Sequence, residues 1–270
     1  MRRFGLAHLE LRGEPRSPEK ATPVRLSRNT LLAIEQAAVR SWPALETGDI
    51  DGWLWRYASG GSLRANSVAA LAFTGASVES AIAEAEARYR AKGAPCRFTV
   101  AEVSVPGDLD RRLEALGYAR NQDHVTMAKD VGPAEAMPGD VELAADPTPE
   151  WLAVYLSGVS ADRKAIAPTI LAGLPAPRAY LACRRAGAVV GSGLTIPDGD
   201  LASVQCMATL PAARRTGCAR RVLAAIQAEA ARRGCRLLYL QTECANTPAV
   251  MLYESFGFRV GGRYHLRWKP

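Results

Sequence analysis

The sequence predicts a mixed α/β (α+β) protein built from two similar halves, and three observations lead to this fold class. Amphipathic helical segments alternate with short apolar strands from residue 29 onward. A strand, a short helix and a Gly-aromatic pair recur, first as FTVAEV with DLDRRLEALGY and again as LYLQTE with NTPAVMLYESFGF. Between the halves, residues 131–139 are rich in Pro, Gly and Ala, which is typical of a linker.

The elements of the first half, residues 29–130, follow from periodicity and from helix and turn signals. Ser77 can cap a helix over 76–93, and Gly93 ends it. The remaining predicted elements are a helix at 29–47, strands at 52–61, 63–73 and 96–103, a short helix at 108–118, and a strand at 124–130.

The second half, residues 140–270, shows the same alternation. A Gly-containing loop leads into a helix that runs to Arg233, where Gly234 provides the stop signal. The other predicted elements are strands at 141–144, 178–185, 188–196, 201–209 and 237–243, helices at 149–159, 162–174 and 247–256, and closing strands after Gly257 and Gly262.

Composition excludes several classes of protein. Hydrophobic residues make up 48% and charged residues 23%, which is ordinary for a globular chain and unlike a disordered one. No apolar run reaches the roughly 18 residues of a spanning helix, and the first residues lack the apolar stretch of a signal peptide. We therefore expect a cytoplasmic protein without a membrane partner. The six cysteines form no C-x-x-C pair and no metal-site spacing, which favours reduced thiols and no metal.

The net charge of +7 consists of two separate excesses. Residues 1–28 contain seven basic and three acidic residues in a polar, Pro-containing segment, for which we expect a flexible arm. Residues 139–270 contain sixteen basic and ten acidic residues. Many of these basic residues fall in one stretch, which is either a solvated helix face or an anion site: Arg214, Arg215, Arg220, Arg221, Arg232, Arg233 and Arg236.

The stretch VQCMATLPAARRTGCARRVLAAIQAEAARRG, residues 204–234, carries the clearest chemical signal. A strand, a loop and a helix start follow one another, so unpaired backbone N–H groups and the positive end of the helix dipole meet in one place, where phosphate binds. Gly217 lets the backbone approach a ligand, and Arg214, Arg215 and Arg220 add positive charge. The Walker and Rossmann glycine patterns are absent from this sequence.

Two motifs resemble those of the GCN5-related N-acetyltransferases. Arg214-x-x-Gly217-x-Ala219 is similar to the family's pyrophosphate-binding signature. The run from Asn246 to Phe258 is similar at every defined position to the family pattern N-x-x-A-x-x-L-Y-x-x-x-G-F. The resemblance covers residues 140–270 and implies a mostly antiparallel, twisted sheet flanked by helices, with residues 29–130 as a degenerate copy.

The resemblance also implies that acetyl-CoA binds the second half and donates its acetyl group to an amine. The backbone of Met207 and Thr209 is then expected to pair with the pantetheine arm, and Asn246 to hold this arm or cap the helix. The remaining residues implied to bind the cofactor surround the pyrophosphate, through loop amides or charge: Arg214, Arg215, Thr216, Gly217, Cys218, Ala219 and Arg220.

Two residues are candidates for proton transfer. Tyr253 is either the general acid that protonates the leaving thiolate or a core residue with only its hydroxyl polar. In the family that the sequence resembles, ribosomal-protein N-acetyltransferases have a Glu on the strand before the Asn motif. Here that position is Gln241, and a glutamine cannot act as a base. Glu243 lies two residues further along, on the same face of the strand, and is either the base or an exposed carboxylate. The alternative acceptor of the proton is a chain of water molecules that leads to backbone carbonyls.

The first half lacks both motifs, so we expect no cofactor there. Trp53, Arg56 and Asn66 are either core residues or contributors to an acceptor pocket between the halves. The acceptor is either a small amine or a protein N-terminus, and the sequence leaves the oligomeric state open. The alternative functions are a silent acyl-CoA sensor and, with only charge in its favour, nucleic-acid binding. We expect no nucleic-acid partner.

Overall fold

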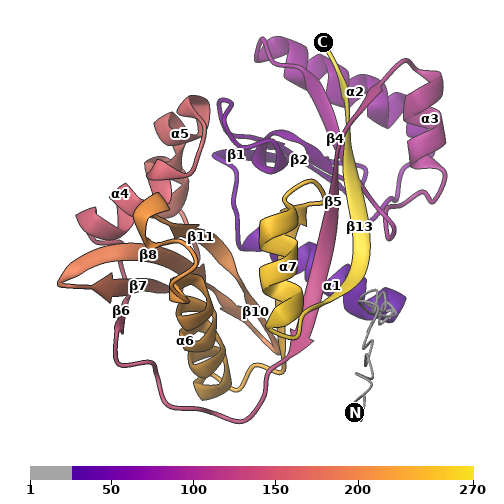
Figure 1. The fold of residues 1–270 in the computed structure, drawn as a ribbon. Helices are drawn as coiled ribbons and strands as arrows, with labels where there is room; N and C mark the ends of the chain where they lie inside the picture. The colour runs from indigo at the N-terminus through magenta and orange to yellow at the C-terminus, as the bar shows by residue number, and fades with distance from the viewer. Residues whose placement is uncertain (1–25) are drawn as a thin grey trace, which may run out of the picture.

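The computed structural model describes residues 26–270 and has the mixed, mostly antiparallel architecture predicted from the sequence (Figure 1). All of the predicted basic arm except its last three residues lies outside this range. In the first half the elements are α1 (Arg28–Arg40), β1 (Glu46–Ile50), β2 (Trp53–Tyr57), the short 3₁₀ helix η1 (Arg64–Asn66), β3 (Val68–Ala69), α2 (Val78–Ala91), β4 (Cys96–Ala101), α3 (Leu109–Ala115) and β5 (Ala119–Asp130).

Residues 131–140, which include the predicted linker, contain no helix or strand and lead into the second half. Its elements are β6 (Val141–Ala144), α4 (Pro149–Ser157), α5 (Ala161–Ala172), β7 (Ala179–Arg185), β8 (Ala188–Thr195), β9 (Pro197–Asp198), β10 (Leu201–Ser203), β11 (Gln205–Thr209), the 3₁₀ helix η2 (Pro211–Ala213), α6 (Cys218–Arg232), β12 (Leu237–Glu243), α7 (Thr247–Ser255) and β13 (Arg259–Lys269).

A nine-stranded sheet joins the two halves in the order β1-β2-β3-β4-β13-β5-β12-β10-β9. The last strand of each half lies between the final two strands of the other half. β13 pairs with β4 and β5, and β5 pairs with β13 and β12, all antiparallel. Figure 1 shows β5 and β13 side by side through the middle of the molecule. The halves therefore share one backbone hydrogen-bond ladder.

The predicted strand at 201–209 is wrong as a single strand, because the chain changes sheets within it. Residues of β10 pair in parallel with β12, and Val204 donates a last backbone hydrogen bond to Tyr239. From Gln205 onward the chain pairs only with β8, at the edge of a four-stranded sheet in the order β11-β8-β7-β6. A bulge and a left-handed backbone at Cys206 (φ 51°) accompany the change.

The strand predicted at 63–73 is also mostly wrong. The segment forms η1 and the two-residue β3, because the buried side chain of Asn66 stabilises a local turn. Its Oδ1 accepts from the backbone of Ala58, and its Nδ2 donates to the carbonyls of Gly60 and Ser62. Such side chain–backbone bonds compete with strand pairing. This turn brings Arg64 to the cleft between the halves.

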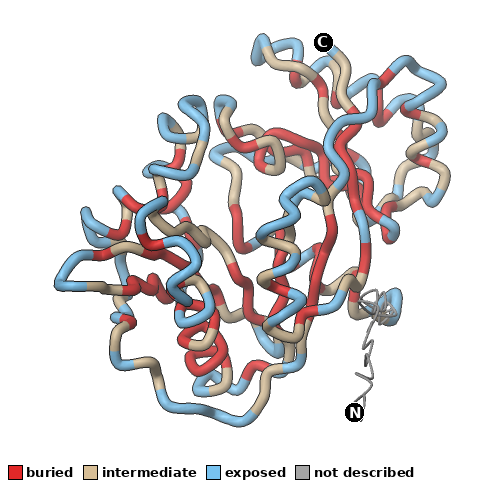
Figure 2. The backbone as a smooth tube through the Cα atoms, viewed as in Figure 1, coloured by how far each residue is buried: buried red, intermediate tan, exposed pale blue. Residues whose placement is uncertain are grey.

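Several apolar clusters fix the layers, as the buried red segments in Figure 2 show. The largest cluster lies between α6 and the strands beside it, and another packs α4 and α5 on the opposite side of β7 and β8. A Cβ at Gly191 of β8 would overlap Sγ of Cys218, so this glycine allows the start of α6 to lie directly on the strand.

Candidate active site

A cavity of about 480 Å³ lies where β11 leaves β12, and both halves line it. Gln205, Cys206 and Met207 come from one wall, and Tyr239 to Glu243 from the other. Because β11 is an edge strand of its sheet, its outer backbone groups have no strand partner within residues 26–270. Met207 therefore lines a gap with backbone groups available for a ligand, whereas Thr209 lies beyond the cavity, toward the loop before α6.

The loop after β11 delivers the start of α6 beside this gap. Gly217 is the N-cap residue with φ 82°, a left-handed backbone that suits glycine, and no side chain caps the helix. The first-turn N–H groups, including those of Ala219 and Arg220, are thus free of a side-chain cap. Thr216 donates its hydroxyl hydrogen to the carbonyl of Ala213, which fixes the loop. Cys218 is buried in the core, so only its backbone is available to a ligand.

A second hollow of about 640 Å³ adjoins this helix start, lined by Thr216, Gly217 and Arg220 among others. Arg220 contacts the carbonyl of Ser255 at 3.3 Å and stands over the ring of Phe256. No carboxylate within residues 26–270 pairs with Arg220, Arg214 or Arg215, since the ion pairs of this region involve other arginines. The hollow therefore has unneutralised positive charge at its rim.

The interpretation of all seven clustered arginines as one anion site is wrong. Helix α6 has fifteen residues, so its ends are about 22 Å apart at about 1.5 Å per residue. Arg232 and Arg233 lie at the far end and pair with the buried Glu229. Arg236 faces Asp200, and Arg221 pairs with Asp140. Near the helix start, Arg214, Arg215 and Arg220 are the members of the seven without a carboxylate partner within residues 26–270.

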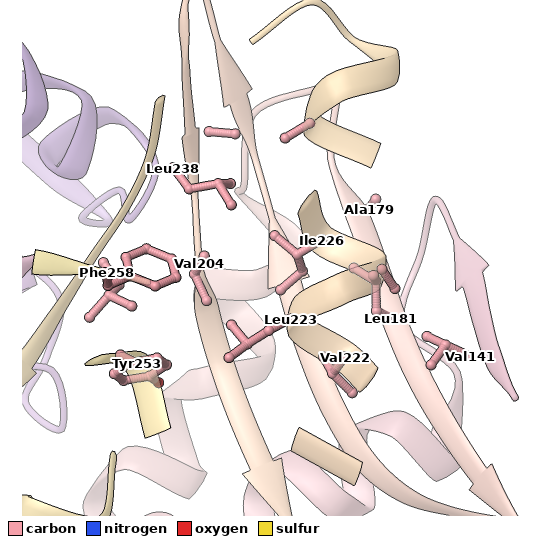
Figure 3. Packing of buried hydrophobic residues seen from close by; sticks show 14 of the residues in the cluster. Val141, Ala179, Leu181, Val204, Val222, Leu223, Ile226, Leu238, Tyr253 and Phe258 are labelled. Atoms are coloured by element: carbon pink, nitrogen blue, oxygen red, sulfur yellow. The ribbon is translucent and has the colours of Figure 1, made fainter. Parts of the chain in front are cut away.

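Tyr253 reaches the cavity from α7 and is otherwise packed in the core. The residue is 8% exposed, and its ring meets the ring of Phe258 edge-on, with 5.9 Å between the ring centres. Figure 3 shows both rings at one side of the core cluster, near Val204. The hydroxyl makes no hydrogen bond to another described residue, and burial raises the pKa of Tyr253 to about 12. The phenol therefore keeps its proton at neutral pH.

Asn246, Glu243 and His124 also line the cavity. Asn246 caps α7 by accepting from the backbone of Ala249 at 3.4 Å, and it also lines the cavity. Glu243 is exposed at the end of β12, opposite His124 on β5. Nδ1 of His124 lies 2.9 Å from the carbonyl of Gln122, which requires it to be the donor and leaves Nε2 as the free lone pair. Burial lowers the pKa of His124.

A buried polar network sits behind the cavity, centred on Gln241. Its Nε2 donates to both carboxylate oxygens of Glu35 at 2.9 and 2.8 Å, and its Oε1 accepts from Nη1 of Arg64 at 2.6 Å. Thr126 donates to Glu35 as well, at 2.7 Å. Burial raises the pKa of Glu35, against the lowering effect of these hydrogen bonds.

The first-half residues singled out from the sequence lie away from the cavity. Trp53 is fully buried and donates to the carbonyl of Val105, Arg56 is buried against Ser67, and Asn66 holds its own turn. Trp42 and Arg64 line the cavity in their place.

Arg64, Glu35 and His124 are functional candidates that no sequence motif marks. Arg64 comes from η1, Glu35 from α1 and His124 from β5. All three elements lie far from the two motifs in the sequence, so no local pattern indicates a role for these residues. Within residues 26–270 no three His, Cys, Asp or Glu side chains form a possible metal site. No helix in the same range is long and apolar enough to cross a membrane.

Comparison with known proteins places this geometry in a family. Residues 29–267 match the family described as "Probable histone acetyltransferase Rv0428c C-terminal". The Mycobacterium tuberculosis protein of that name is 29% identical over 252 residues, which cover 92% of this chain and 76% of the relative.

Solved structures support the same fold at low identity. A GCN5-related N-acetyltransferase from Kribbella flavida superposes with a TM-score of 0.67 at 16% identity, covering 92% of this chain and 96% of the other. A tandem protein of the same fold from the clavulanic acid biosynthesis pathway superposes with a TM-score of 0.57 at 15% identity, covering 80% and 77%. The chain belongs to the family of the Rv0428c C-terminal region, and its fold is that of the GCN5-related N-acetyltransferases.

Proposed function

We propose that this protein transfers an acetyl group from acetyl-CoA to a primary amine by direct attack in a ternary complex. The observation that carries the proposal is the divergence of β11 from β12: Tyr253 lines the gap between them, and the loop after β11 leads to the uncapped start of α6. The gap and the helix start are suited to the two parts of one ligand, a reactive thioester and a pyrophosphate.

The residues present fit acetyl-CoA. The free backbone edge at Met207 and Thr209 suits the amide groups of a pantetheine arm. The amides after Gly217 and the charge of Arg214, Arg215 and Arg220 suit a pyrophosphate. Asn246 can cap α7 and face the arm at once. Acetyl-CoA supplies an acetyl group activated as a thioester.

Tyr253 is the proposed general acid. Its proton is retained at neutral pH, its hydroxyl is free, and it lies in the wall of the cavity. When the amine nitrogen bonds to the acetyl carbon and the carbon–sulfur bond breaks, the phenol can protonate the departing sulfur.

The attacking nitrogen must lose a proton, and two groups in the cavity can accept it. Glu243 is the residue proposed from the sequence. His124 faces it across the strands and offers a neutral imidazole with Nε2 free. We propose that this pair accepts the proton, with the carboxylate of Glu243 stabilising an imidazolium at His124.

The acceptor classes are a small amine, a protein N-terminus and, following the name of the M. tuberculosis relative, a histone lysine. The test is thiol release from acetyl-CoA across an amine library that samples all three, with Tyr253→Phe as the control.

One observation favours a second function, an acyl-CoA sensor without catalytic activity. Gln241 occupies the position at which some acetyltransferases of this fold have a glutamate that acts as the general base. The amide of Gln241 is fully hydrogen-bonded to Glu35 and Arg64. Acetyl-CoA binding without thiol release from any amine supports the sensor and contradicts the enzyme.

A further inference from the structure

Two arginines line the cavity without a carboxylate partner. Arg64 enters from η1 and donates to the side-chain amide of Gln241. Arg163 enters from α5 and stands 5.5 Å from the ring centre of Trp42. No ion pair within residues 26–270 involves either guanidinium, whereas Arg178, Arg184 and Arg267, for example, each pair with a carboxylate.

The two guanidinium groups act on the same wall of the cavity. Burial raises the pKa of the Cys206 thiol to about 12, and the positive charges of Arg163 and Arg64 both oppose this rise. Cys206 of β11 and both arginines line the same cavity, so the two cations and this strand belong to one site. This strand forms the wall opposite Tyr253 and Glu243.

Buried polar atoms without partners converge on the same region. The hydroxyl of Tyr155, a residue only 2% exposed, makes no hydrogen bond of ordinary geometry to a described residue. Nε of Arg163 and Oε1 of Gln205 are unpaired in the same way. All three residues line the cavity. Tyr155 and Arg163 are neighbours in this wall, beside Cys206. Because unpaired buried polar atoms are costly, this group of side chains is suited to a polar ligand.

The balance of charges around the cavity indicates whether that ligand is an anion or a cation. Behind the wall, Glu35 faces both Arg56 and Arg64, so even an ionised Glu35 leaves one arginine uncompensated. Arg163 adds a further positive charge, and the acid that lines the cavity, Glu243, is exposed at its mouth. The inner part of the cavity thus favours an anion, and the mouth favours a cation.

Resting on the acetyl transfer proposed above, we infer that the acceptor is a small amine that also carries an anionic group, a carboxylate or a phosphate, bound by Arg64 and Arg163. The amine end then lies toward Glu243 and His124, and the anionic end toward the arginines. Guanidinium groups bind both anions with paired hydrogen bonds. A cavity of about 480 Å³ suits a small molecule. A histone tail, with several cations in sequence, would meet repulsion from the same arginines.

The experiment compares matched amines in a thiol-release assay with the full chain. Phenylalanine is compared with phenylalaninamide and phenethylamine, γ-aminobutyrate with butylamine, and O-phosphoethanolamine with ethanolamine. A histone H3 N-terminal peptide completes the panel. The variants are Arg163→Gln, Arg163→Lys and Arg64→Gln, and Lys164→Gln is the matched control because it removes an exposed charge from the same helix.

We expect acidic amines to exceed their neutral partners in kcat/KM by about 10- to 100-fold, the value of a charge-assisted hydrogen bond. Arg163→Gln should reduce this ratio to a few-fold through KM, Arg163→Lys should restore part of it, and Lys164→Gln should leave it unchanged. Acetyl-CoA affinity should stay constant in all variants. The better of the carboxylate and phosphate series identifies the anion.

Three outcomes overturn the inference. Acetylation of neutral amines or of the histone peptide at equal or higher efficiency overturns it and leaves the acetyl transfer intact. The same holds if both Arg163→Gln and Arg64→Gln keep the preference for acidic amines. Acetyl-CoA binding with no thiol release from any amine overturns the proposed acetyl transfer, and the inference with it.

Discussion

Arg64 donates a hydrogen bond of 2.6 Å to Oε1 of Gln241, and this contact joins the first half of the chain to the strand that precedes the Asn246 motif. The residues are 177 positions apart in the sequence. Because the amide of Gln241 is held on its other side by Glu35, its orientation is fixed. The side chain at the position of a possible base thus serves to hold an arginine at the cavity.

Tyr253→Phe should lower kcat by about 100-fold or more, the usual contribution of a positioned proton donor. The ring contact with Phe258 is retained in this variant, so folding and acetyl-CoA affinity should be unchanged. Thiol release and equilibrium binding measure the two quantities. An unchanged kcat would remove Tyr253 from the mechanism.

The pH dependence of kcat should separate His124 from Glu243. Burial lowers the pKa of His124, so the neutral imidazole persists below its ordinary range and activity should fall only at pH values under about 6.5. His124→Gln should remove this acidic limb and most of the rate. Glu243→Gln should move the limb to lower pH, because the Glu243 charge raises the pKa of His124. If the fall of kcat at acidic pH is the same in His124→Gln as in the wild type, another group is the base.

Glu35→Gln should change how stability depends on pH. The raised pKa of Glu35 means that the folded state holds its proton more tightly than the unfolded state, so the wild type loses stability as pH rises through that pKa. A glutamine retains one acceptor oxygen for Thr126 and Gln241, and it has no carboxyl group that ionises. Between pH 5 and pH 8, urea unfolding should show that the wild type loses more stability than Glu35→Gln does. Glu243→Gln, at an exposed position, is the control, and equal losses in all three proteins would contradict the prediction.

Arg220→Gln should weaken acetyl-CoA binding by about tenfold, since it removes a charge at the rim of the hollow beside α6. Arg236→Gln is the matched control, because this exposed arginine has only a distant contact with Asp200. Isothermal titration at two salt concentrations should show a smaller salt effect in Arg220→Gln than in the control. Equal affinities would place the phosphates elsewhere.

A fragment of residues 139–270 should fail to fold alone. It lacks β5, which lies between β12 and β13, so both strands would expose unpaired edges. Solubility and circular dichroism test this, and coexpression with residues 1–138 should restore a folded complex. A monomeric fragment that folds and binds acetyl-CoA would show that the shared ladder is dispensable.

The parts predicted best from the sequence are those encoded by short local patterns. Gly217 with its flanking loop gave the start of α6, and the run from Asn246 to Phe258 gave α7 and its cap. Both motifs concern consecutive residues whose backbone geometry is decided within one turn of helix. Signals of this kind depend on neighbouring residues, so they predict structure even when the long-range contacts are unknown.

Long-range contacts carried no such signal. The strand at 201–209 has one continuous β pattern, yet its two parts pair with different sheets, which only the positions of β8 and β12 decide. Likewise the contact of Glu35 with Gln241 spans 206 positions. The polar wall of the cavity therefore emerged only from the fold, because each of its residues looks ordinary in its own segment.

The exchange of β5 and β13 has a consequence for synthesis of the chain on the ribosome. β13 is translated after every other described strand, yet its place is between β4 and β5, near the middle of the nine-stranded sheet. Until it emerges, β4 and β5 lack the neighbour that they share in the finished protein. The edges of β4 and β5 that β13 covers in the finished protein therefore stay unpaired while the second half is made. Unpaired strand edges favour aggregation, so this is the period in which binding of a chaperone would protect the nascent chain most.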